Sequence, residues 1–325
     1  MLKVALDAMG GDKTPGEIVR GAVMAAEASE GRYSIVLTGP KELVREEIAK
    51  TGYKGDLIEV VDAPQLVAMD EHPAAVLKTK PDSGLVKCVA LQKAGLVQAS
   101  VSAGNSGAMM ASCMMLLGRI PGVSRPAIAA EVPSMKGPVL MLDCGANVDN
   151  KPQQLVDWAH CGAVYAEAVM GKANPRVGLL NIGEEEKKGP ELEVEVHQML
   201  KASSLNFVGN VEPGEYLRGG TDVLVTGGFS GNLLLKTMEG VYEVVVRLFG
   251  DALSSSKGAG FVEGWNYDKQ GGALLIGLQG TGIIAHGRAE APAIKAALEQ
   301  AWKFASGEVS RKIAERMAAA QPQAN

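Results

Sequence analysis

Two kinds of segment alternate along this chain. Short, nearly continuous apolar runs are typical of strands buried on both faces, and longer stretches with helical periodicity separate them. The predicted strands are Lys3–Leu6, Ser34–Thr38, Leu57–Val61, Ala99–Val101, Ile128–Val132, Val139–Leu142, Val177–Asn181 and Asp222–Val225. The clearest predicted helices are Gly16–Glu30, Glu42–Lys50 and Leu155–Met170. This alternation predicts an α/β fold in which helices cover both faces of a mostly parallel sheet.

The C-terminal part of the chain follows a different pattern. Asp251 to Gly272 is polar and rich in Gly and Ser, so we expect an excursion without regular structure. A final amphipathic helix, about Pro292–Phe304, precedes a tail that frays. We therefore expect one catalytic domain at 1–310, made of two interwoven lobes without a linear boundary. A helix end and a tail occupy 311–325.

Composition and charge exclude several classes of protein. The chain has 325 residues, 46% of them apolar, and a net charge of −5 without a basic tract dense enough for nucleic acid. The N-terminal stretch is too polar for a signal peptide, and no apolar run reaches about 18 residues, the length that spans a membrane. The four cysteines have no CxxC spacing, which favours free thiols in a reducing cytoplasm.

Gly-rich loops follow several of the predicted strands. They lie at 7–12, 102–108, 143–149, 181–189 and 226–232. Ligands of parallel sheets bind at the carboxyl ends of the strands, near helix N-termini. Because the Walker A and GxGxxG patterns are both absent, we expect these loops to bind phosphate or carboxylate without a nucleotide. For any single loop, a tight turn that uses glycine for packing is the alternative.

The candidate residues for binding phosphate or substrate come mainly from these loops. They are Asp7, Gly10, Gly11, Ser102, Gly104, Asn105, Ser106, Gly107, Asn147, Ser230, Gly231 and His286. His286 is included because it follows an apolar run and would reach the edge of the sheet. Backbone N–H groups converge where a strand ends in small residues, and the next helix adds its own unpaired N–H groups.

Lys188 has an unusual position. It lies just before a predicted helix whose first turn contains Pro190, where a cation opposes the helix dipole. An anion between the lysine and the helix would explain this placement. A solvated surface lysine is the alternative interpretation.

The run TGGFSGNLLLKTMEG predicts another helix start. Ser230 is the expected N-cap, which places Asn232 in the first turn beside exposed N–H groups. Asn232 would donate to a developing oxyanion, or would serve only in capping. Core positions are expected at Leu233, Leu234, Met238 and Val241.

Several kinds of catalytic site are absent from the sequence. HExxH, GxSxG and cysteine–histidine signatures do not occur, and the four histidines are dispersed, so we expect no metal site. His197 falls within a predicted helix and is expected at the surface. A site of this composition suits a reaction whose nucleophile arrives with the substrate, such as phosphate attack on a thioester.

Taken together, the motifs resemble a known family. ALDAMGGD, MDEHPAAVLKTKPDSG, SAGNSGAMMA, DCGANVDNKPQQL, VGLLNIGEEEKKGPEL, NFVGNVE, DVLVTGGFSGNLLLKTMEG and GGALLIGLQG…IIAHG occur in this order. They are similar to the blocks of the phosphate acyltransferases of bacterial phospholipid synthesis, the acyl-acyl-carrier-protein:phosphate transacylases. The resemblance covers about residues 2–305, and several blocks are longer than any generic turn.

The resemblance implies a fold, a reaction and partners. The fold is a three-layer α/β/α sandwich like that of isocitrate dehydrogenase and phosphotransacetylase. The reaction converts acyl-acyl carrier protein and inorganic phosphate into acyl phosphate and free carrier protein. It needs no metal or cofactor, and the enzyme is a homodimer whose product feeds a membrane glycerol-phosphate acyltransferase. The catalytic lysine and asparagine of the family match Lys188 and Asn232.

The chain departs from the family pattern at three positions. Gly227 stands where an aspartate is usual, Gly84 replaces the second serine of a DSS block, and Lys187 replaces a glycine. These departures put substrate preference and rate in question more than the type of reaction.

The resemblance also implies surface contacts. Acidic carrier protein would dock on basic side chains, for which the candidates are Lys78, Lys80, Lys87, Lys93, Arg119 and Arg125. Weak peripheral contact with the inner face of the membrane is expected through Phe261, Val262 and Trp265, with plain cytoplasmic solubility as the alternative. The rival functions are a coenzyme A-dependent phosphate acetyl- or butyryltransferase, a nicotinamide- and metal-dependent dehydrogenase, and a non-catalytic scaffold.

Overall fold

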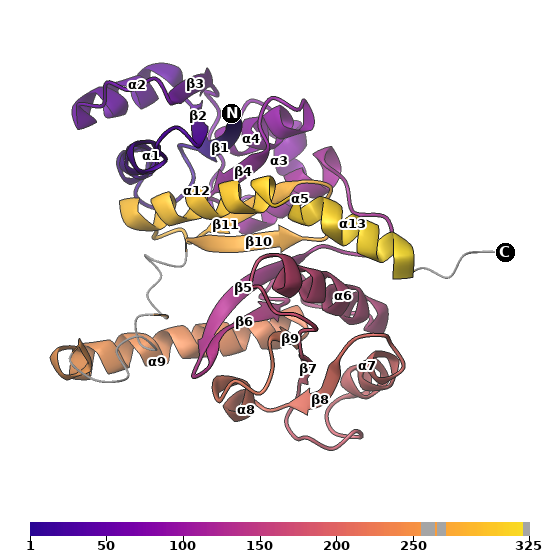
Figure 1. Cartoon of the computed structure of the whole chain (residues 1–325). Coiled ribbons are helices and arrows are strands. Elements are labelled where there is room, and N and C mark those ends of the chain that lie inside the picture. The colour runs from indigo at the N-terminus through magenta and orange to yellow at the C-terminus, as the bar shows by residue number, and fades with distance from the viewer. Residues whose placement is uncertain (255–263, 265–270, 321–325) are drawn as a thin grey trace. The chain divides into compact units, whose positions relative to one another are not determined.

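The computed structural model describes residues 1–254, 264 and 271–320. The chain divides into two compact units (Figure 1). Unit 1 consists of Met1–Arg119 and Tyr267–Ser310, and unit 2 consists of Ile120–Asn266 and Arg311–Asn325. The chain therefore leaves unit 1 after Arg119 and returns to it near the C-terminus.

The strands of unit 1 form a mostly parallel sheet. They are β1 (Leu2–Asp7), β2 (Tyr33–Gly39), β3 (Ile58–Asp62), β4 (Ala99–Ser102), β10 (Gly272–Ile276) and β11 (Thr281–Ala285). Their order is β3-β2-β1-β4-β11-β10, and β10 runs antiparallel to β11. Since β1, β4 and β11 are parallel neighbours, their carboxyl ends lie at one edge.

Helices pack on this sheet in two sets. They are α1 (Gly16–Ala28), α2 (Lys41–Thr51), α3 (Pro73–Thr79), α4 (Gly84–Lys93), α5 (Ser106–Leu116) and α12 (Ala291–Ser306). The first set contains α1, which contacts α2 and α12, and the second contains α5, which contacts α3 and α4. A Cβ atom at Gly21 would lie 2.5 Å from Cβ of Ile294, so α1 and α12 approach closely. Ala5 and Val36 of the strands form a buried cluster with Cys88 of α4.

Unit 2 also consists of a mostly parallel sheet with helices packed on it, and its sheet has fewer strands than that of unit 1. They are β5 (Ala127–Ser134), β6 (Gly137–Leu142), β7 (Val177–Leu180), β8 (Phe207–Val211) and β9 (Val223–Val225), in the order β5-β6-β9-β7-β8. Only the β5–β6 pair is antiparallel among the pairs described in this unit. The carboxyl ends of β6, β9 and β7 therefore share an edge.

The helices of unit 2 are α6 (Pro152–Ala168), α7 (Glu191–Lys201), α8 (Pro213–Leu217), α9 (Gly228–Ser254) and α13 (Val309–Ala320). On one face, Gly162 of α6 packs against Val223 and Leu142 of the strands. Buried side chains of β5, β6, β8 and β9 form a cluster against which Leu234 and Met238 of α9 pack. The α/β class and the mostly parallel sheet predicted from the hydrophobic pattern are confirmed.

The structure differs from the prediction in the C-terminal part. α9 continues to Ser254 and β10 begins at Gly272, so both ends of the expected excursion belong to regular elements. Its remainder, including Phe261, Val262 and Trp265, lies outside the described residues, apart from Gly264. The chain after α12 does not become an irregular tail at once. It first forms a second helix, α13, in which Ile313 and Met317 are buried.

Three strands, β8, β10 and β11, were not predicted from the sequence. β8 contains Gly209 and Asn210, which interrupt its apolar run, and β10 is a short apolar run that begins at the second of two adjacent glycines. β11 follows β10 after four residues and lies within one apolar stretch with it. Pairing with neighbouring strands stabilises these segments more than their own residues do.

Candidate active site

The loops that follow β1, β4 and β11 meet at the edge of unit 1. The backbone N–H of Asp12 donates to the carbonyl of Gly287 at 2.7 Å. Gly11 has φ +113°, and a Cβ there would approach both Gly287 and Ala103. Because few other residues adopt this conformation, glycine at this position allows the three loops to touch.

Asp7 is the buried centre of this edge. Its side chain is only 3% exposed, its Oδ1 accepts the N–H of Met9 at 3.1 Å, and its Oδ2 accepts the hydroxyl of Ser102 at 2.9 Å. The Ser102 hydroxyl in turn accepts the N–H of Gly104 at 3.0 Å. Burial raises the pKa of Asp7 to about 6, and the two hydrogen bonds oppose the rise. The carboxylate thus organises the loop after β4.

Glycines surround Asp7 without space for a side chain. A Cβ atom at Gly10 would lie 2.7 Å from Asp7 Oδ2, Ser102 Oγ and the nitrogen of Gly104. A Cβ at Gly84 would lie 2.3 Å from Asp7 Oδ1. The serine expected at position 84 from the resemblance would therefore require Asp7 or its surroundings to shift in this chain.

The side chain of Asn105 is occupied by protein contacts. It is the N-cap of α5, and its Oδ1 accepts the N–H of Ala108 at 2.9 Å. Its Nδ2 donates to the carbonyls of Glu71 and Met69 at 2.9 and 3.1 Å. Asn105 therefore anchors the chain before α3, and the exposed Ser106 is the more open group at this helix start.

Gly107 and His286 complete the predicted residues of unit 1. A Cβ at Gly107 would lie 2.6 Å from Cγ of Pro73, so α3 and α5 pack closely there. His286 directly follows β11, and its Nδ1 accepts the N–H of Arg288 at 3.1 Å. The structure thus brings the predicted loops of unit 1 to one edge, with His286 in the turn after β11.

Asp143 is the corresponding buried acid of unit 2, and the sequence analysis did not select it. Its Oδ1 accepts the N–H groups of Ile128 and Ala146 at 2.9 and 3.1 Å. Its Oδ2 accepts the N–H and Nδ2 of Asn147 at 2.8 and 2.9 Å. The residue is wholly buried, which raises the pKa of its carboxyl against the lowering effect of these bonds. Its position directly after a predicted buried strand is the feature of the sequence that could have identified Asp143 as a site residue.

The first turn of α9 packs directly on Asp143. A Cβ at Gly228 would lie 2.6 Å from Asp143 Oδ2 and 2.3 Å from the carbonyl oxygen of Asn147. A Cβ at Gly231 would lie 2.0 Å from the carbonyl oxygen of Asp143. Glycine at both positions lets the helix begin against the loop. The role of Gly231 is thus close packing.

The prediction that Ser230 is the N-cap of this helix is wrong. α9 begins at Gly228, so Ser230 is its third residue. The Gly228 N–H is accepted by Asn150 Oδ1 at 3.2 Å, which supplies the cap from another loop. The local sequence does not contain this distant partner.

Asn232 and Asn147 occupy different environments at this edge. Asn232 is exposed in the second turn of α9, and its Cγ lies 3.0 Å from the position of a Cβ at Gly145. Asn147 is 6% exposed, and its Nδ2 also donates to the carbonyl of Pro126 at 2.9 Å. Asn232 is therefore available to a ligand, whereas Asn147 holds the loop together.

Gly227 lies beside the side-chain amide of Asn150 and has no side chain that could contact it. A Cβ at Gly227 would lie 2.7 Å from Asn150 Oδ1. Asn150 Nδ2 is a buried donor that lacks a partner within the described part of the chain. An aspartate at 227, as the resemblance leads one to expect, would thus stand beside this amide.

Lys188 lies on a loop that is held by its own backbone. Asn181, at the end of β7, donates its Nδ2 to the carbonyl of Lys188 at 2.9 Å, and the Lys188 N–H donates to the carbonyl of Glu185 at 3.0 Å. Gly189, with φ +88°, packs against Asn181 Oδ1. α7 begins at Glu191 with Pro190 as N-cap. Lys188 thus precedes the helix as predicted, although Pro190 is one residue outside the first turn.

The ammonium group of Lys188 is open to solvent. Its side chain is 48% exposed, and Nζ lies 3.6 Å from Oε1 of Glu185. The pKa of Glu185 is lowered, first by a hydrogen bond from its own backbone N–H and then by the charge of Lys188. An ion pair this exposed contributes little to stability. The exposed charge of Lys188 is therefore not needed to stabilise this loop.

His197 is not at the surface, contrary to the prediction. It is 4% exposed on α7, its Nδ1 lies 2.9 Å from Asn210 Oδ1, and its ring meets Phe207 edge to face. Asn210 Nδ2 also donates to the carbonyl of Glu185 at 2.8 Å. This histidine and this asparagine together brace the loop that carries Lys188.

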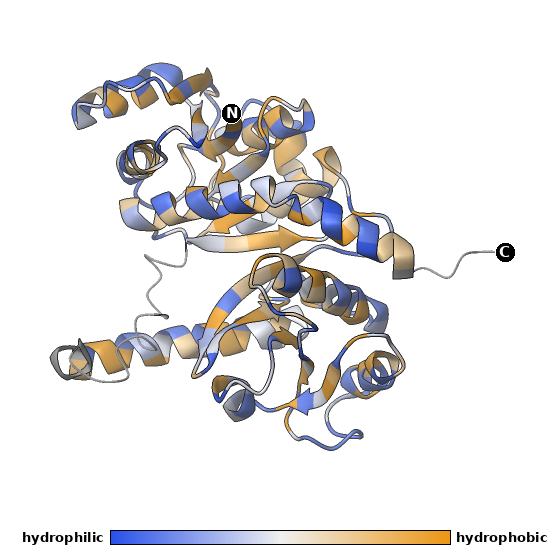
Figure 2. Ribbon diagram, in the orientation of Figure 1, coloured by the Kyte–Doolittle hydropathy of each residue, from blue (hydrophilic) through white to orange (hydrophobic). Residues whose placement is uncertain are grey.

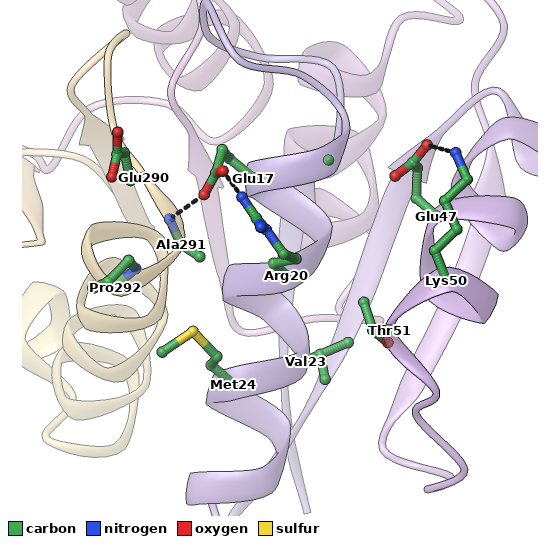
Figure 3. A pocket seen from close by; sticks show the side chains of 11 residues that line it. Glu17, Arg20, Val23, Met24, Glu47, Lys50, Thr51, Glu290, Ala291 and Pro292 are labelled. Carbon is green, nitrogen blue, oxygen red and sulfur yellow. Dashed lines mark hydrogen bonds and ion pairs between the residues drawn. The ribbon is translucent and has the colours of Figure 1, made fainter.

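One cavity is lined by none of the predicted site residues. It has a volume of about 730 Å³ and lies between α1, α2 and the start of α12 (Figure 3). Its charged side chains are paired, Arg20 with Glu17 and Lys50 with Glu47. Glu17 also accepts the N–H of Ala291 at 3.0 Å. These ion pairs and this hydrogen bond account for the charged side chains that line the cavity, so a bound ligand is not needed to explain them.

Buried thiols and dispersed acids limit the chemistry of the site. All four cysteines are free and buried, and burial is the main cause that raises the pKa of each thiol. The expected absence of disulfides is thus confirmed. Within the described ranges, no three His, Cys, Asp or Glu side chains are grouped as a metal site would need.

Solved structures share the fold at low sequence identity. A phosphotransacetylase from Streptococcus pyogenes aligns with a TM-score of 0.65 and 17% identity, over 94% of each chain. A branched-chain phosphotransacylase from Enterococcus faecalis V583 aligns with a TM-score of 0.60 and 16% identity, over 94% of this chain and 99% of its own. A 4-hydroxythreonine-4-phosphate dehydrogenase from Klebsiella pneumoniae gives 0.56 and 13%, with 94% and 99% covered. At such identities the likeness concerns the fold.

Sequence comparison is more specific. The family model "Fatty acid synthesis protein" matches residues 2–312. The phosphate acyltransferase of Desulforamulus reducens is 44% identical over 93% of both chains, and that of Heliobacterium modesticaldum is 45% identical over 92% of this chain and 93% of its own. That of Dictyoglomus turgidum is 43% identical over 97% of both. The chain belongs to the phosphate acyltransferase family and is an acyltransferase.

Proposed function

We propose that this enzyme transfers a fatty acyl group from acyl-acyl carrier protein to inorganic phosphate and releases acyl phosphate for phospholipid synthesis. The observation that carries the proposal is the edge of unit 2. There, Lys188 and Asn232 are exposed while the acid and amides around them are bound to the protein. An open cation and an open amide suit a phosphate nucleophile and a tetrahedral oxyanion.

In the proposed reaction, an oxygen of hydrogen phosphate attacks the thioester carbonyl carbon. A C–O bond forms, the C–S bond breaks, and the proton of the phosphate passes to the leaving thiolate. Lys188 offsets the charge of phosphate, and Asn232 donates to the oxyanion. Within unit 1, the loops around Asp7, Ser102 and Ser106 are proposed as an anion-binding region of their own, with the backbone N–H groups at the start of α5 as donors.

Burial of the thiols supports direct transfer. An acyl-enzyme formed on cysteine would need an accessible thiol with a lowered pKa, whereas burial raises the pKa of Cys113 to about 12. Cys144 is the thiol nearest the edge of unit 2 in sequence, and it is 5% exposed with its Sγ–H directed to the carbonyl of Met141. Phosphate itself is therefore the proposed nucleophile.

The proposal is tested by a single assay with the whole protein. Purified enzyme is incubated with palmitoyl-acyl carrier protein, with and without phosphate, while free carrier protein and hydroxylamine-trapped acyl phosphate are followed. We expect both products only when phosphate is present. Release of carrier protein without phosphate would indicate a thioesterase, and no release would favour a scaffold. Higher activity with acetyl- or butyryl-coenzyme A would favour the coenzyme A-dependent rival.

Two exposed lysines of unit 1 support docking of acidic carrier protein. Lys78 on α3 and Lys93 on α4 form no ion pair with any described residue. By contrast, Lys80 pairs with Glu71, and Lys87 pairs with Asp82 at 2.7 Å. We therefore place Lys78 and Lys93, rather than all the basic candidates, in the docking surface.

Docking through these lysines predicts a dependence on salt. Raising the salt concentration to about 0.3 M should increase the KM for carrier-protein substrate several-fold, because exposed charges are screened. K78E and K93E should increase this KM further at low salt. The exposed Lys54, in the loop before β3, provides the matched control K54E, which should behave like wild type. A KM that is insensitive to salt and to all three variants would contradict this docking surface.

The outer half of α9 supports a homodimer. Val241, Val244, Leu248 and Phe249 are 52–66% exposed, and Figure 2 shows hydrophobic residues along this helix. A second copy of the chain would remove these side chains from water. The prediction of Val241 as a core residue is wrong for the single chain.

The proposal also includes weak contact with the inner face of the membrane. No helix within the described residues is long and apolar enough to cross a bilayer. We place the enzyme in the cytoplasm, with weak contact at the inner membrane face, because its product would be consumed there by a glycerol-phosphate acyltransferase. A fatty acyl phosphate is a reactive mixed anhydride with a charged head and a long apolar chain, so short transfer distances favour this location.

A further inference from the structure

Large apolar side chains stand exposed on the loops that surround Lys188 and Asn232. Val148 is 70% exposed in the loop after β6, Ile182 is 77% exposed in the loop after β7, and Phe229 is 64% exposed at the start of α9. Leu233, one turn beyond Phe229 on the same helix face, is 59% exposed, although the sequence predicted it in the core.

Each of these side chains adjoins a residue of the edge in unit 2. Val148 follows Asn147, whose carbonyl oxygen packs on Gly228, and Phe229 follows Gly228. Ile182 follows Asn181, and its own N–H donates to Asn181 Oδ1 at 2.8 Å. The strands from which the loops leave, β6, β9 and β7, are neighbours in the sheet. The apolar groups therefore gather at the same edge as the reacting groups.

Single exposed apolar residues are ordinary on protein surfaces, but a group of them at a reactive edge indicates a ligand. The other exposed side chains of the loop after β7 are mostly charged, Glu184 to Lys188, and water is a good solvent for them. The surface proposed for a second copy begins at Val241, eight residues beyond Leu233, which is about 12 Å along a helix. The experiment therefore includes a measurement of oligomeric state, which separates the two uses of these side chains.

We propose that Val148, Ile182, Phe229 and Leu233 hold the hydrocarbon chain of the acyl substrate and make the enzyme selective for long acyl groups. This inference rests on the proposed function, since the thioester carbon must lie beside Lys188 and Asn232. The methylene groups next to that carbon then contact the apolar side chains. Each buried CH₂ strengthens binding about fourfold, so acetyl and butyryl groups lack most of this contribution.

The test compares acyl chain lengths in surface variants. I182S and F229S are assayed with palmitoyl- and butyryl-carrier protein at saturating phosphate. We expect each to lower kcat/KM for the palmitoyl substrate about tenfold and to leave the butyryl value within about twofold. Exposed positions tolerate such substitutions, and thermal unfolding checks that the variants are folded. The control is M135S, because Met135 is 75% exposed in the same unit and lies in the turn between β5 and β6.

Each other outcome overturns the proposal. Equal losses for both substrates would show that the side chains do not contact the hydrocarbon chain, and unchanged values would show the same. A change of oligomeric state without any dependence on chain length would assign the surface to a second copy. An equal effect of M135S would indicate a general loss of surface hydrophobicity. If wild type itself forms no acyl phosphate, the proposed function fails, and this inference fails with it because it rests on that function.

Discussion

Replacing Lys188 with alanine is expected to lower kcat about 100- to 1,000-fold without unfolding the protein. The loss arises because the Nζ charge would no longer offset the phosphate during attack on the thioester. The fold should persist because Lys188 is held by backbone atoms, its carbonyl by Asn181 and its N–H by Glu185. Its one described ion pair is exposed and contributes little. Hydroxylamine trapping of acyl phosphate measures kcat, and thermal unfolding reports the fold.

The neighbouring lysine provides the control. Lys187 is also exposed in this loop, so K187A removes the same charge one residue away and should keep more than about half of the activity. K188R retains a cation with different geometry and should recover part of kcat. Near-normal turnover in K188A, or equal losses in K188A and K187A, would show that Lys188 has no specific catalytic role.

Replacing Asp7 with asparagine is expected to stabilise the protein at neutral pH by about 3 kcal/mol at most. Burial raises the pKa of Asp7 from 3.8 to about 6 in the folded chain, so folding favours the protonated form. Its stabilising contribution is complete below about pH 3.8 and is lost as the pH rises through about 6. Above that pH the buried, ionised carboxylate destabilises the fold. Asparagine stays neutral and can still accept the Met9 N–H.

The measurement is urea unfolding of wild type and D7N between pH 5 and about 8. The difference in unfolding free energy should grow with pH and level off above about 7. S102A retains the carboxylate, so it should keep the decline of stability with rising pH. A difference between wild type and D7N that does not change with pH would show that the Asp7 pKa is not raised. Greater stability of wild type at pH 8 would contradict the sign.

Much of the candidate site could be proposed from the sequence because it depends on local chemistry. A lysine before a helix start, an asparagine near another and glycines after apolar strands are patterns within a few residues. Asn105, which the sequence analysis gave as a candidate for binding phosphate, is the N-cap of α5. Whether these side chains are free to contact a ligand could not be predicted from such local patterns. Asn105 and Asn147 are bound to backbone groups, whereas Asn232 is exposed.

The wrong predictions share one physical cause. His197 is buried because it lies against Asn210, from a strand that was not predicted, whose Oδ1 accepts a hydrogen bond from the His197 Nδ1–H. Ser230 is not the N-cap because Asn150 caps Gly228 from 78 residues away. Leu233 has the spacing of a core residue, but the core lies on the other side of α9, where Leu234 and Met238 pack. In each case the deciding partner is distant in sequence.

The sequence by itself determined the α/β class, most strands, the family and the two residues proposed for catalysis. These follow from hydrophobic periodicity and from motifs whose chemistry is carried by adjacent residues. Only the tertiary structure decided which polar groups are free, that Asp7 and Asp143 are the buried centres of the two edges, and that apolar side chains stand exposed beside Lys188 and Asn232. Burial and hydrogen bonding depend on partners that the fold brings together from distant parts of the chain.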